Sequence, residues 1–221
     1  MVIRFYLIMY FTEFTKYIPK ILNQQLPAFN AHAKMAPLER LKTLSADYYK
    51  DNNPKRSAVM MLFYPKNDKA HLVLIRRNEY PGVHSAQISF PGGQAEPSDA
   101  DLKETALRET YEEIGVLPEE IDVIKEFTEI YIPPSNFLVM PYLGITATKP
   151  QFVPNPDEVT ALIELPLDAF LDDSIVIEVD METSYSQKIK VPAFVFEGHI
   201  VWGATAMIMS ELKETIKNAI K

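Results

Sequence analysis

The sequence predicts an α+β fold, and the arrangement of its apolar segments supports that prediction. Strand-length apolar runs come in consecutive pairs joined by short polar turns, such as 58–64 and 71–75, which is typical of hairpins and not of βαβ crossovers. Helical periods lie at the beginning, in the middle and at the end of the chain. At 221 residues the chain is long enough for one domain with an extension.

Charge and cysteine usage exclude several classes of function. The formal net charge of −8 argues against a general binder of nucleic acid or of membrane surfaces. The sequence contains no cysteine, which excludes disulfides, thiolate metal sites and cysteine nucleophiles. It also agrees with a reducing compartment, so we expect a cytoplasmic protein. Whether the chain forms a homodimer is left open.

Residues 1–55 are expected to form a helical extension of the main domain. The apolar segment 1–12 is too short to span a bilayer, and no small-residue cleavage site follows it. We therefore expect a short buried strand or helix there, with Met9 as an alternative start of the chain. From residue 11 to 26 apolar residues recur at a helical period, and Pro19 is expected to kink or divide this helix.

The main domain, residues 56–221, is expected to begin with the hairpin around the turn 65–68. Residues 27–56 before it should hold a loop and a short helix. Apolar runs, polar turns and helical periods then predict these elements: strands 121–132, 137–146 and 160–165, a short helix 167–171, strands 174–179 and 188–196, and a last helix at about 204–221.

A central helix lies between the first hairpin and strand 121–132. Ser98, Asp99 and Asp101 are candidate caps at its start. Gly115 signals its end, and Pro118 lies just beyond. These signals delimit a helix that carries the most unusual charge pattern of the chain.

Glu109, Glu112 and Glu113 stand at i, i+3 and i+4 of this helix, so their carboxylates project from one face. Like charges at that spacing repel, whereas a hard divalent cation such as Mg²⁺ requires clustered oxygen ligands. Arg108 can orient a carboxylate bidentately, and the glycine pair 92–93 lets the backbone approach a ligand. The alternative interpretation is a solvated acidic helix face.

The segment resembles the Nudix box, which is Gly, five residues, Glu, seven residues, and then Arg-Glu-aliphatic-x-Glu-Glu-x-Gly-aliphatic. The matching residues are Gly93, Arg108, Glu109, Glu112, Glu113, Gly115 and Val116. Thr110 stands where an aliphatic residue is usual. The first Glu falls at Asp99 counted from Gly93, or at Ala100 counted back from Arg108, so the loop is one residue longer than the general pattern.

The longer loop and the residues before it are similar to the coenzyme A pyrophosphatase branch of that family. The run Phe90-Pro91-Gly92-Gly93 matches the branch, as do Leu74 and Arg77 upstream and the segment 202–206 near the end of the chain. Four upstream positions depart from its pattern, namely Ile75, Asn78, Gly82 and Ala86.

The resemblance implies the Nudix fold, a mixed β-sheet sandwiched between α-helices. It implies a catalytic set of Arg108, Glu109, Glu112 and Glu113. It also implies a Mg²⁺ or Mn²⁺ ion held by the three glutamates and the Gly92 carbonyl. The expected substrate-binding residues are Arg76, Arg77, Gly93 and Glu158, with Glu158 as a candidate additional carboxylate from a loop. One of the two arginines is expected to face solvent, because neighbours on a strand point to opposite sides.

The function implied is hydrolysis of the diphosphate of coenzyme A or acyl-CoA, a small nucleotide substrate, to 3′,5′-ADP and the (acyl-)4′-phosphopantetheine half. Two alternatives remain open. The same chemistry could act on ADP-ribose, a dinucleotide or a nucleotide sugar. A Nudix-like module could also bind a nucleotide without turnover, although clustered acids favour an enzyme.

Overall fold

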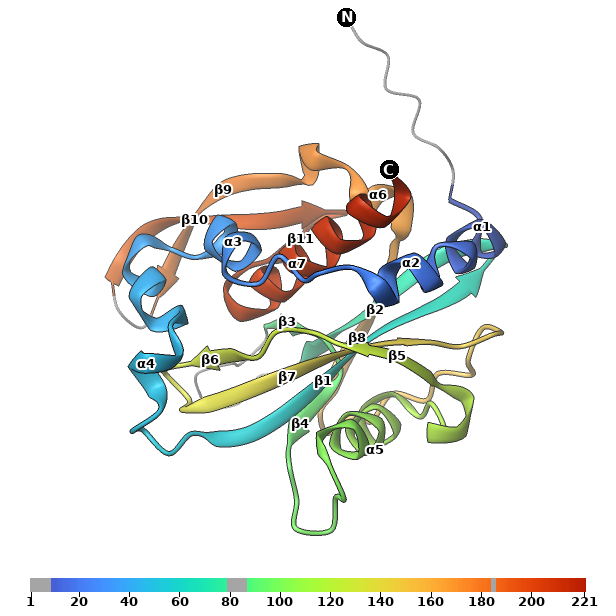
Figure 1. Ribbon diagram of the computed structural model, residues 1–221, viewed down its shortest axis with the longest axis horizontal. Helices are drawn as coiled ribbons and strands as arrows, with labels where there is room; N and C mark the ends of the chain where they lie inside the picture. The colour runs from blue at the N-terminus through green and yellow to red at the C-terminus, as the bar shows by residue number, and fades with distance from the viewer. Residues whose placement is uncertain (1–8, 79–86, 184–185) are drawn as a thin grey trace, which may run out of the picture.

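The computed structural model describes residues 9–78, 87–183 and 186–221, and it has a mixed β-sheet with helices on both faces (Figure 1). Strands β3, β2, β1, β7 and β5 follow one another across an eight-stranded sheet, in which β4 also pairs with β1, β6 with β7 and β8 with β2. The β1–β7 pair is parallel and the other pairs are antiparallel. The α+β prediction is therefore confirmed.

The strands of this sheet are β1 (Lys55–Lys66), β2 (Lys69–Arg77), β3 (Ile88–Ser89), β4 (Gly92–Gln94), β5 (Asp122–Glu126), β6 (Ile130–Ile132), β7 (Phe137–Ile145) and β8 (Val159–Pro166). A second sheet contains β9 (Val176–Thr183), β10 (Ser186–Phe196) and β11 (His199–Val201). The predicted hairpin of β1 and β2 is confirmed, as is the antiparallel pairing of β9 and β10.

The helices occupy two layers. On one face of the large sheet lies α5 (Leu102–Ile114), and on the other lie α7 (Gly203–Ile220) and the second sheet (Figure 1). The shorter helical elements are α1 (Phe11–Lys16), α2 (Ile18–Asn23), α3 (Phe29–His32), η1 (Ala33–Met35), η2 (Leu38–Leu44), α4 (Ala46–Tyr49), η3 (Pro118–Glu120), α6 (Leu167–Leu171) and η4 (Asp173–Ile175). No helix in the described ranges is both long and apolar enough to cross a membrane.

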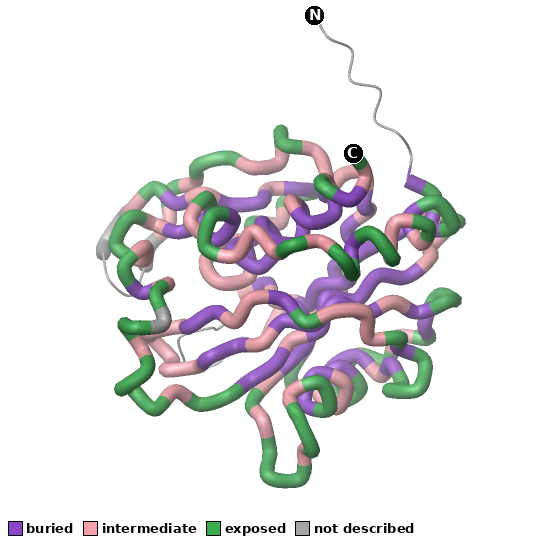
Figure 2. Tube along the Cα trace, in the orientation of Figure 1, coloured by how far each residue is buried: buried purple, intermediate pink, exposed green. Residues whose placement is uncertain are grey.

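The core consists of two clusters, one on each face of the sheet, because successive side chains of a strand alternate between faces. Met60 and Leu62 of β1 pack with Ala106 and Ile114 of α5. The intervening residues Met61 and Phe63 belong to the cluster that contains α7 and α1. Figure 2 shows these buried residues concentrated along the central strands and α7. The continuously apolar pattern of β1 therefore reflects burial on both faces.

Two of the predicted elements are divided in the structure. The predicted helix 11–26 is α1 followed by α2, with the break at Tyr17. Pro19 is the second residue of α2, where its missing N–H costs no helical hydrogen bond. The predicted strand 121–132 is β5 followed by β6, because Thr128 between them donates to the carboxylate of Glu211 instead of to a neighbouring strand.

The N-terminal extension is joined to the rest of the fold through Glu211 of α7, which is fully buried. Its carboxylate accepts hydrogen bonds from the backbone N–H of Ala28 at 2.9 Å and from the N–H and hydroxyl of Thr128 at 3.2 and 2.6 Å. The Nε2 atom of His32 lies 3.3 Å from the same carboxylate. Because a buried carboxylate needs such partners, these contacts connect three distant parts of the chain.

Candidate active site

The candidate site lies where the turn 90–94 meets α5. Phe90 is buried in the core, and β4 pairs with β1 so that Gly92 lies opposite Val59. Gly92 has a φ of 149°, and a Cβ there would lie 2.3 Å from the carbonyl oxygen of Ala58. This close approach directs the N–H of Gly92 to Oε2 of Glu113, at 2.8 Å.

Both ends of α5 form as the sequence predicts. The side chain of Asp101 accepts a hydrogen bond from the N–H of Glu104 at 2.8 Å, which is an N-terminal cap. At the other end Gly115 adopts a left-handed φ of 74° and its N–H donates to the carbonyl of Tyr111. Thr110 fits the buried side of the helix because its hydroxyl donates to the carbonyl of Ala106 at 2.6 Å.

Glu113 is the most buried acid of the site, with a side chain that is 0% exposed. Besides the bond from Gly92, it accepts a hydrogen bond from Arg77 of β2 at 3.1 Å. Burial raises the pKa of Glu113 to about 7, since desolvation outweighs the guanidinium of Arg77 and the N–H of Gly92. The neighbouring carboxylates of Glu109 and Glu158 raise this pKa further.

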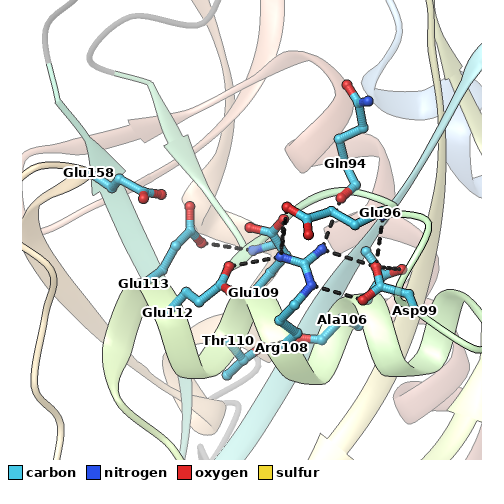
Figure 3. A network of polar contacts seen from close by, with 12 residues as sticks. Gln94, Glu96, Asp99, Ala106, Arg108, Glu109, Thr110, Glu112, Glu113 and Glu158 are labelled. Atoms are coloured by element: carbon cyan, nitrogen blue, oxygen red, sulfur yellow. Dashed lines mark hydrogen bonds and ion pairs between the residues drawn. The ribbon is translucent and has the colours of Figure 1, made fainter.

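Arg108 is a shared partner of the other acids (Figure 3). Its guanidinium donates to both oxygens of Asp99, at 2.9 and 3.0 Å, and to Glu109 and Glu112 at 3.0 and 2.8 Å. It also donates to the carbonyl of Gln94 at 3.0 Å. Arg108 therefore connects the turn, the loop before α5 and two of the predicted site residues.

Asp99, which the sequence indicates as a candidate cap and as one possible position of the first acid of the box, is the main partner of Arg108. Its side chain is 4% exposed, and it also accepts hydrogen bonds from the N–H of Glu96 and the hydroxyl of Thr105. The bidentate contact with Arg108 holds the pKa of Asp99 well below its usual range. The available signal was the count from Gly93, which places the first acid of the box at this residue.

Glu109 and Glu112 differ in their exposure. The side chain of Glu109 is 14% exposed. Burial raises the pKa of Glu109, because desolvation outweighs the positive charge of Arg108, which lowers it. A Cβ on Gly93 would lie 2.4 Å from the carboxyl carbon of Glu109, so this acid fills the space that a side chain at position 93 would need. Glu112 is 47% exposed and reaches back to Arg108.

Glu158 faces this group of acids from the opposite side (Figure 3). It lies in the loop before β8, outside α5, and its charge contributes to the raised pKa of both Glu109 and Glu113. The loop is attached to α5 by a hydrogen bond from the N–H of Asn155 to the carbonyl of Glu113, at 2.9 Å. The fold therefore brings a fourth glutamate to the site from a distant part of the sequence.

The two candidate phosphate-binding arginines lie on opposite faces of the sheet. Arg77 contacts Glu113, whereas Arg76 lies 3.2 Å from Nδ1 of His199 in the second sheet. Both are partly exposed, so the structure does not divide them into one buried and one solvent-facing arginine as expected. Of the two, Arg77 is the one joined to the acids of α5.

The donor chemistry of the site fits a hard divalent cation. Four glutamates lie near a turn whose backbone is brought close by two glycines, and burial raises the pKa of two of them, Glu109 and Glu113. Within residues 9–78, 87–183 and 186–221, no three acidic or histidine side chains converge closely enough to enclose an ion as they stand. Glu109 and Glu112 are directed to Arg108, and Glu113 to Arg77 and Gly92.

The two glycines are expected to differ in their tolerance of a methyl group. Gly92→Ala should lower the free energy of unfolding by about 3 kcal/mol, because its Cβ would meet fixed backbone at a φ unsuited to alanine. Gly93→Ala should lower it by only about 1 kcal/mol, because the end of the Glu109 side chain can move. Urea unfolding of the two variants measures the difference, and equal losses would contradict the packing described.

The metal-free protein is expected to lose stability as pH rises from about 4.5 to about 7. The folded state holds the proton of Glu113 up to a pKa of about 7, whereas the unfolded chain releases it near the ordinary value of 4.5. The free energy of unfolding should therefore fall by about 3 kcal/mol over this interval. Urea unfolding in EDTA at several pH values measures it, and the same slope in Glu113→Gln would assign it to other groups.

Comparison with known proteins shows related sequences. The NUDIX domain model matches residues 54–179 of the chain. The chain is 37% identical over 145 residues to the uncharacterized Nudix hydrolase NudL of Pectobacterium atrosepticum, covering 64% of this chain and 72% of that protein. It is 34% identical over 163 residues to Nudix hydrolase 15, mitochondrial, of Arabidopsis thaliana, covering 71% of this chain and 56% of that one.

Solved structures show a similar fold. A MutT/nudix family protein from Enterococcus faecalis aligns with a TM-score of 0.51 over 86% of this chain and 73% of that chain, at 19% sequence identity. At that identity the match shows a similar fold, with a mixed sheet between helical layers, and carries nothing about substrate.

Proposed function

The chain belongs to the Nudix hydrolase family, and within that family we propose that it is a metal-dependent diphosphatase of coenzyme A or acyl-CoA. The observation that supports a hydrolase best is that Glu109 and Glu113 of α5 and Glu158 of the loop before β8 lie near enough to the turn 90–94 and to one another for their charges to interact. A protein that only binds a nucleotide has no need of acids that repel one another. The full burial of the Glu113 side chain and the 14% exposure of the Glu109 side chain make this repulsion stronger than it would be in water.

The proposed ion is Mg²⁺ or Mn²⁺, held by Glu109 and Glu113 with support from Glu112 and the Gly92 carbonyl. When bound, such an ion would act as a Lewis acid towards phosphate oxygens and would lower the pKa of a bound water. Arg108 places Glu109 and Glu112 and is itself fixed by Asp99. Gly93 leaves the space in which the carboxylate of Glu109 lies.

The proposed reaction is addition of a water oxygen to one phosphorus, with the bridging oxygen leaving on the other phosphate. Arg77 is positioned to bind a phosphate oxygen, since a guanidinium contacts phosphates bidentately. Glu158, on the other side of the acids, is a candidate to accept the water proton or to support the ion. The products from coenzyme A would be 3′,5′-ADP and 4′-phosphopantetheine.

The coenzyme A substrate is proposed from the turn and the strand before it. In the structure Phe90 is buried, the carbonyl of Pro91 accepts a hydrogen bond from Met60, and Gly92 donates to Glu113. The motif that resembles the coenzyme A branch is thus joined directly to the acids. Of the upstream positions, Arg77 contacts Glu113, whereas Gly82 and Ala86 lie outside the described residues.

A substrate panel tests the proposal. Purified protein would be given coenzyme A, acetyl-CoA, ADP-ribose, NADH, diadenosine polyphosphates and dNTPs, each with Mg²⁺ and with Mn²⁺, and products would be identified by mass. We expect 3′,5′-ADP and the pantetheine half from coenzyme A species at the highest kcat/KM. Faster cleavage of ADP-ribose or a dinucleotide would reassign the substrate, and binding without any cleavage would show a non-catalytic module.

A further inference from the structure

The loop 155–158 holds Glu158 in a defined place beside the acids of α5, although Glu158 is exposed. We infer that Asn155 is a positioning residue, whose side-chain amide holds the carboxylate of Glu158 towards Glu113. This inference rests on the proposed function, because it concerns the same hydrolytic site. It assigns Asn155 a role in activity beyond its place in a turn.

The backbone of Asn155 is fixed on both sides. Its N–H donates to the carbonyl of Glu113 at the end of α5, at 2.9 Å. Its own carbonyl accepts hydrogen bonds from the N–H groups of Glu158 and Val159, at 3.1 and 2.8 Å. Asn155 therefore lies at a fixed distance from both the helix and the start of β8.

The side chain of Asn155 uses both ends of its amide. Its Oδ1 accepts a hydrogen bond from the N–H of Asp157 at 3.1 Å. Its Nδ2 donates to Oε1 of Glu158 at 3.3 Å. This orientation of the amide satisfies both contacts, and the reverse orientation would satisfy neither. Aspartate could make the first contact but would repel Glu158.

A second residue secures the loop from the side of β2. The N–H of Asn78 donates to the carbonyl of Glu158 at 2.9 Å, and its side-chain Nδ2 donates to the carbonyl of Pro156 at 2.8 Å. Asn78 directly follows Arg77, which contacts Glu113. The loop is thus attached to both α5 and β2, and among the described residues the hydrogen bond from Asn155 is the one made to the carboxylate itself.

Electrostatics would otherwise turn Glu158 away from this place. The carboxylates of Glu109 and Glu113 repel it, and an exposed glutamate has free rotamers that would direct its charge into water. In Figure 3 the side chain of Glu158 nevertheless extends towards Glu113. A donor on Asn155 offsets part of that repulsion, which is useful where Glu158 acts on the ion or the attacking water.

The test compares Asn155→Ala, Asn155→Asp, Glu158→Gln and the double variant Asn155→Ala/Glu158→Gln. We expect each Asn155 variant to lower kcat by about 10- to 100-fold with little change in KM. Losses of this size are typical when a residue that orients a functional side chain by a hydrogen bond is removed. In the Glu158→Gln background, Asn155→Ala should cause no further loss. Asp157→Asn, which changes the charge of an exposed neighbour, is the matched control and should retain wild-type kcat.

A role confined to the turn predicts different results. Asn155→Asp keeps the acceptor for the N–H of Asp157, so wild-type kcat in this variant would overturn the inference. Losses that add in the double variant would overturn it as well. Crystal structures of the wild type and Asn155→Asp provide a readout that does not require activity: Glu158 should turn away from Glu113 in the variant, and an unmoved Glu158 refutes the positioning role even in a protein that cleaves no diphosphate.

Discussion

Glu113→Gln is expected to lower kcat by about 1,000-fold or more while the protein remains folded. The substitution removes the charge of Glu113, the most buried acid of the site. The loss in kcat corresponds to about 4 kcal/mol of transition-state stabilisation. A bound metal ion stabilises a transition state by a similar amount. Folding should survive, because burial disfavours the charged form of Glu113 and glutamine can still accept the N–H of Gly92. Steady-state kinetics and thermal unfolding of the same preparations measure both effects.

The matched control for this variant is Glu119→Gln, an identical substitution at an exposed acid just after α5. It should leave kcat unchanged. Undiminished turnover in Glu113→Gln would remove Glu113 from the proposed metal ligands. Unfolding of Glu113→Gln at room temperature would instead show that the acid is needed for the fold.

Arg108→Ala should cause the largest loss of stability, about 3–5 kcal/mol, together with loss of activity. It leaves Asp99, which is 4% exposed, without its bidentate partner, and an uncompensated buried charge costs about that much. It also frees Glu109 and Glu112 from the cation that draws them together. Urea unfolding at neutral pH in EDTA measures the change.

Two further variants separate this explanation from a general effect of losing an arginine. In Asp99→Asn/Arg108→Ala the unpaired buried carboxylate is absent, so the double variant should have a larger free energy of unfolding than Arg108→Ala alone. Arg56→Ala breaks an exposed ion pair with Glu129 and should cost less than about 1 kcal/mol. A loss below that value in Arg108→Ala would show that Asp99 is adequately solvated or satisfied by its other partners.

The parts of the fold that could be predicted from sequence are those set by local interactions. The ends of α5 follow from Asp101 and Gly115, whose caps involve residues three or four positions away. The hairpin of β1 and β2 follows from an apolar alternation around a polar turn. The spacing of Glu109, Glu112 and Glu113 follows from the period of a helix.

What the sequence did not predict depends on contacts between distant residues. The division of β5 from β6 results from hydrogen bonds between Thr128 and Glu211, 83 residues apart. The contact of Arg77 with Glu113 spans 36 residues, and no periodicity indicates which of two adjacent arginines makes it. The part played by Asp99 was obscured by a loop one residue longer than the general pattern.

The buried carboxylate of Glu211 determines how far the polypeptide can be shortened. A recombinant fragment that starts at residue 54, where the match to the NUDIX domain begins, would retain Glu211 and Thr128 but would lose the N–H of Ala28 and the imidazole of His32. The carboxylate of Glu211 would then keep only the hydrogen bonds from Thr128 among the contacts described above. We therefore expect this fragment to be less stable than one that retains residues 28–32, which supply both of these contacts.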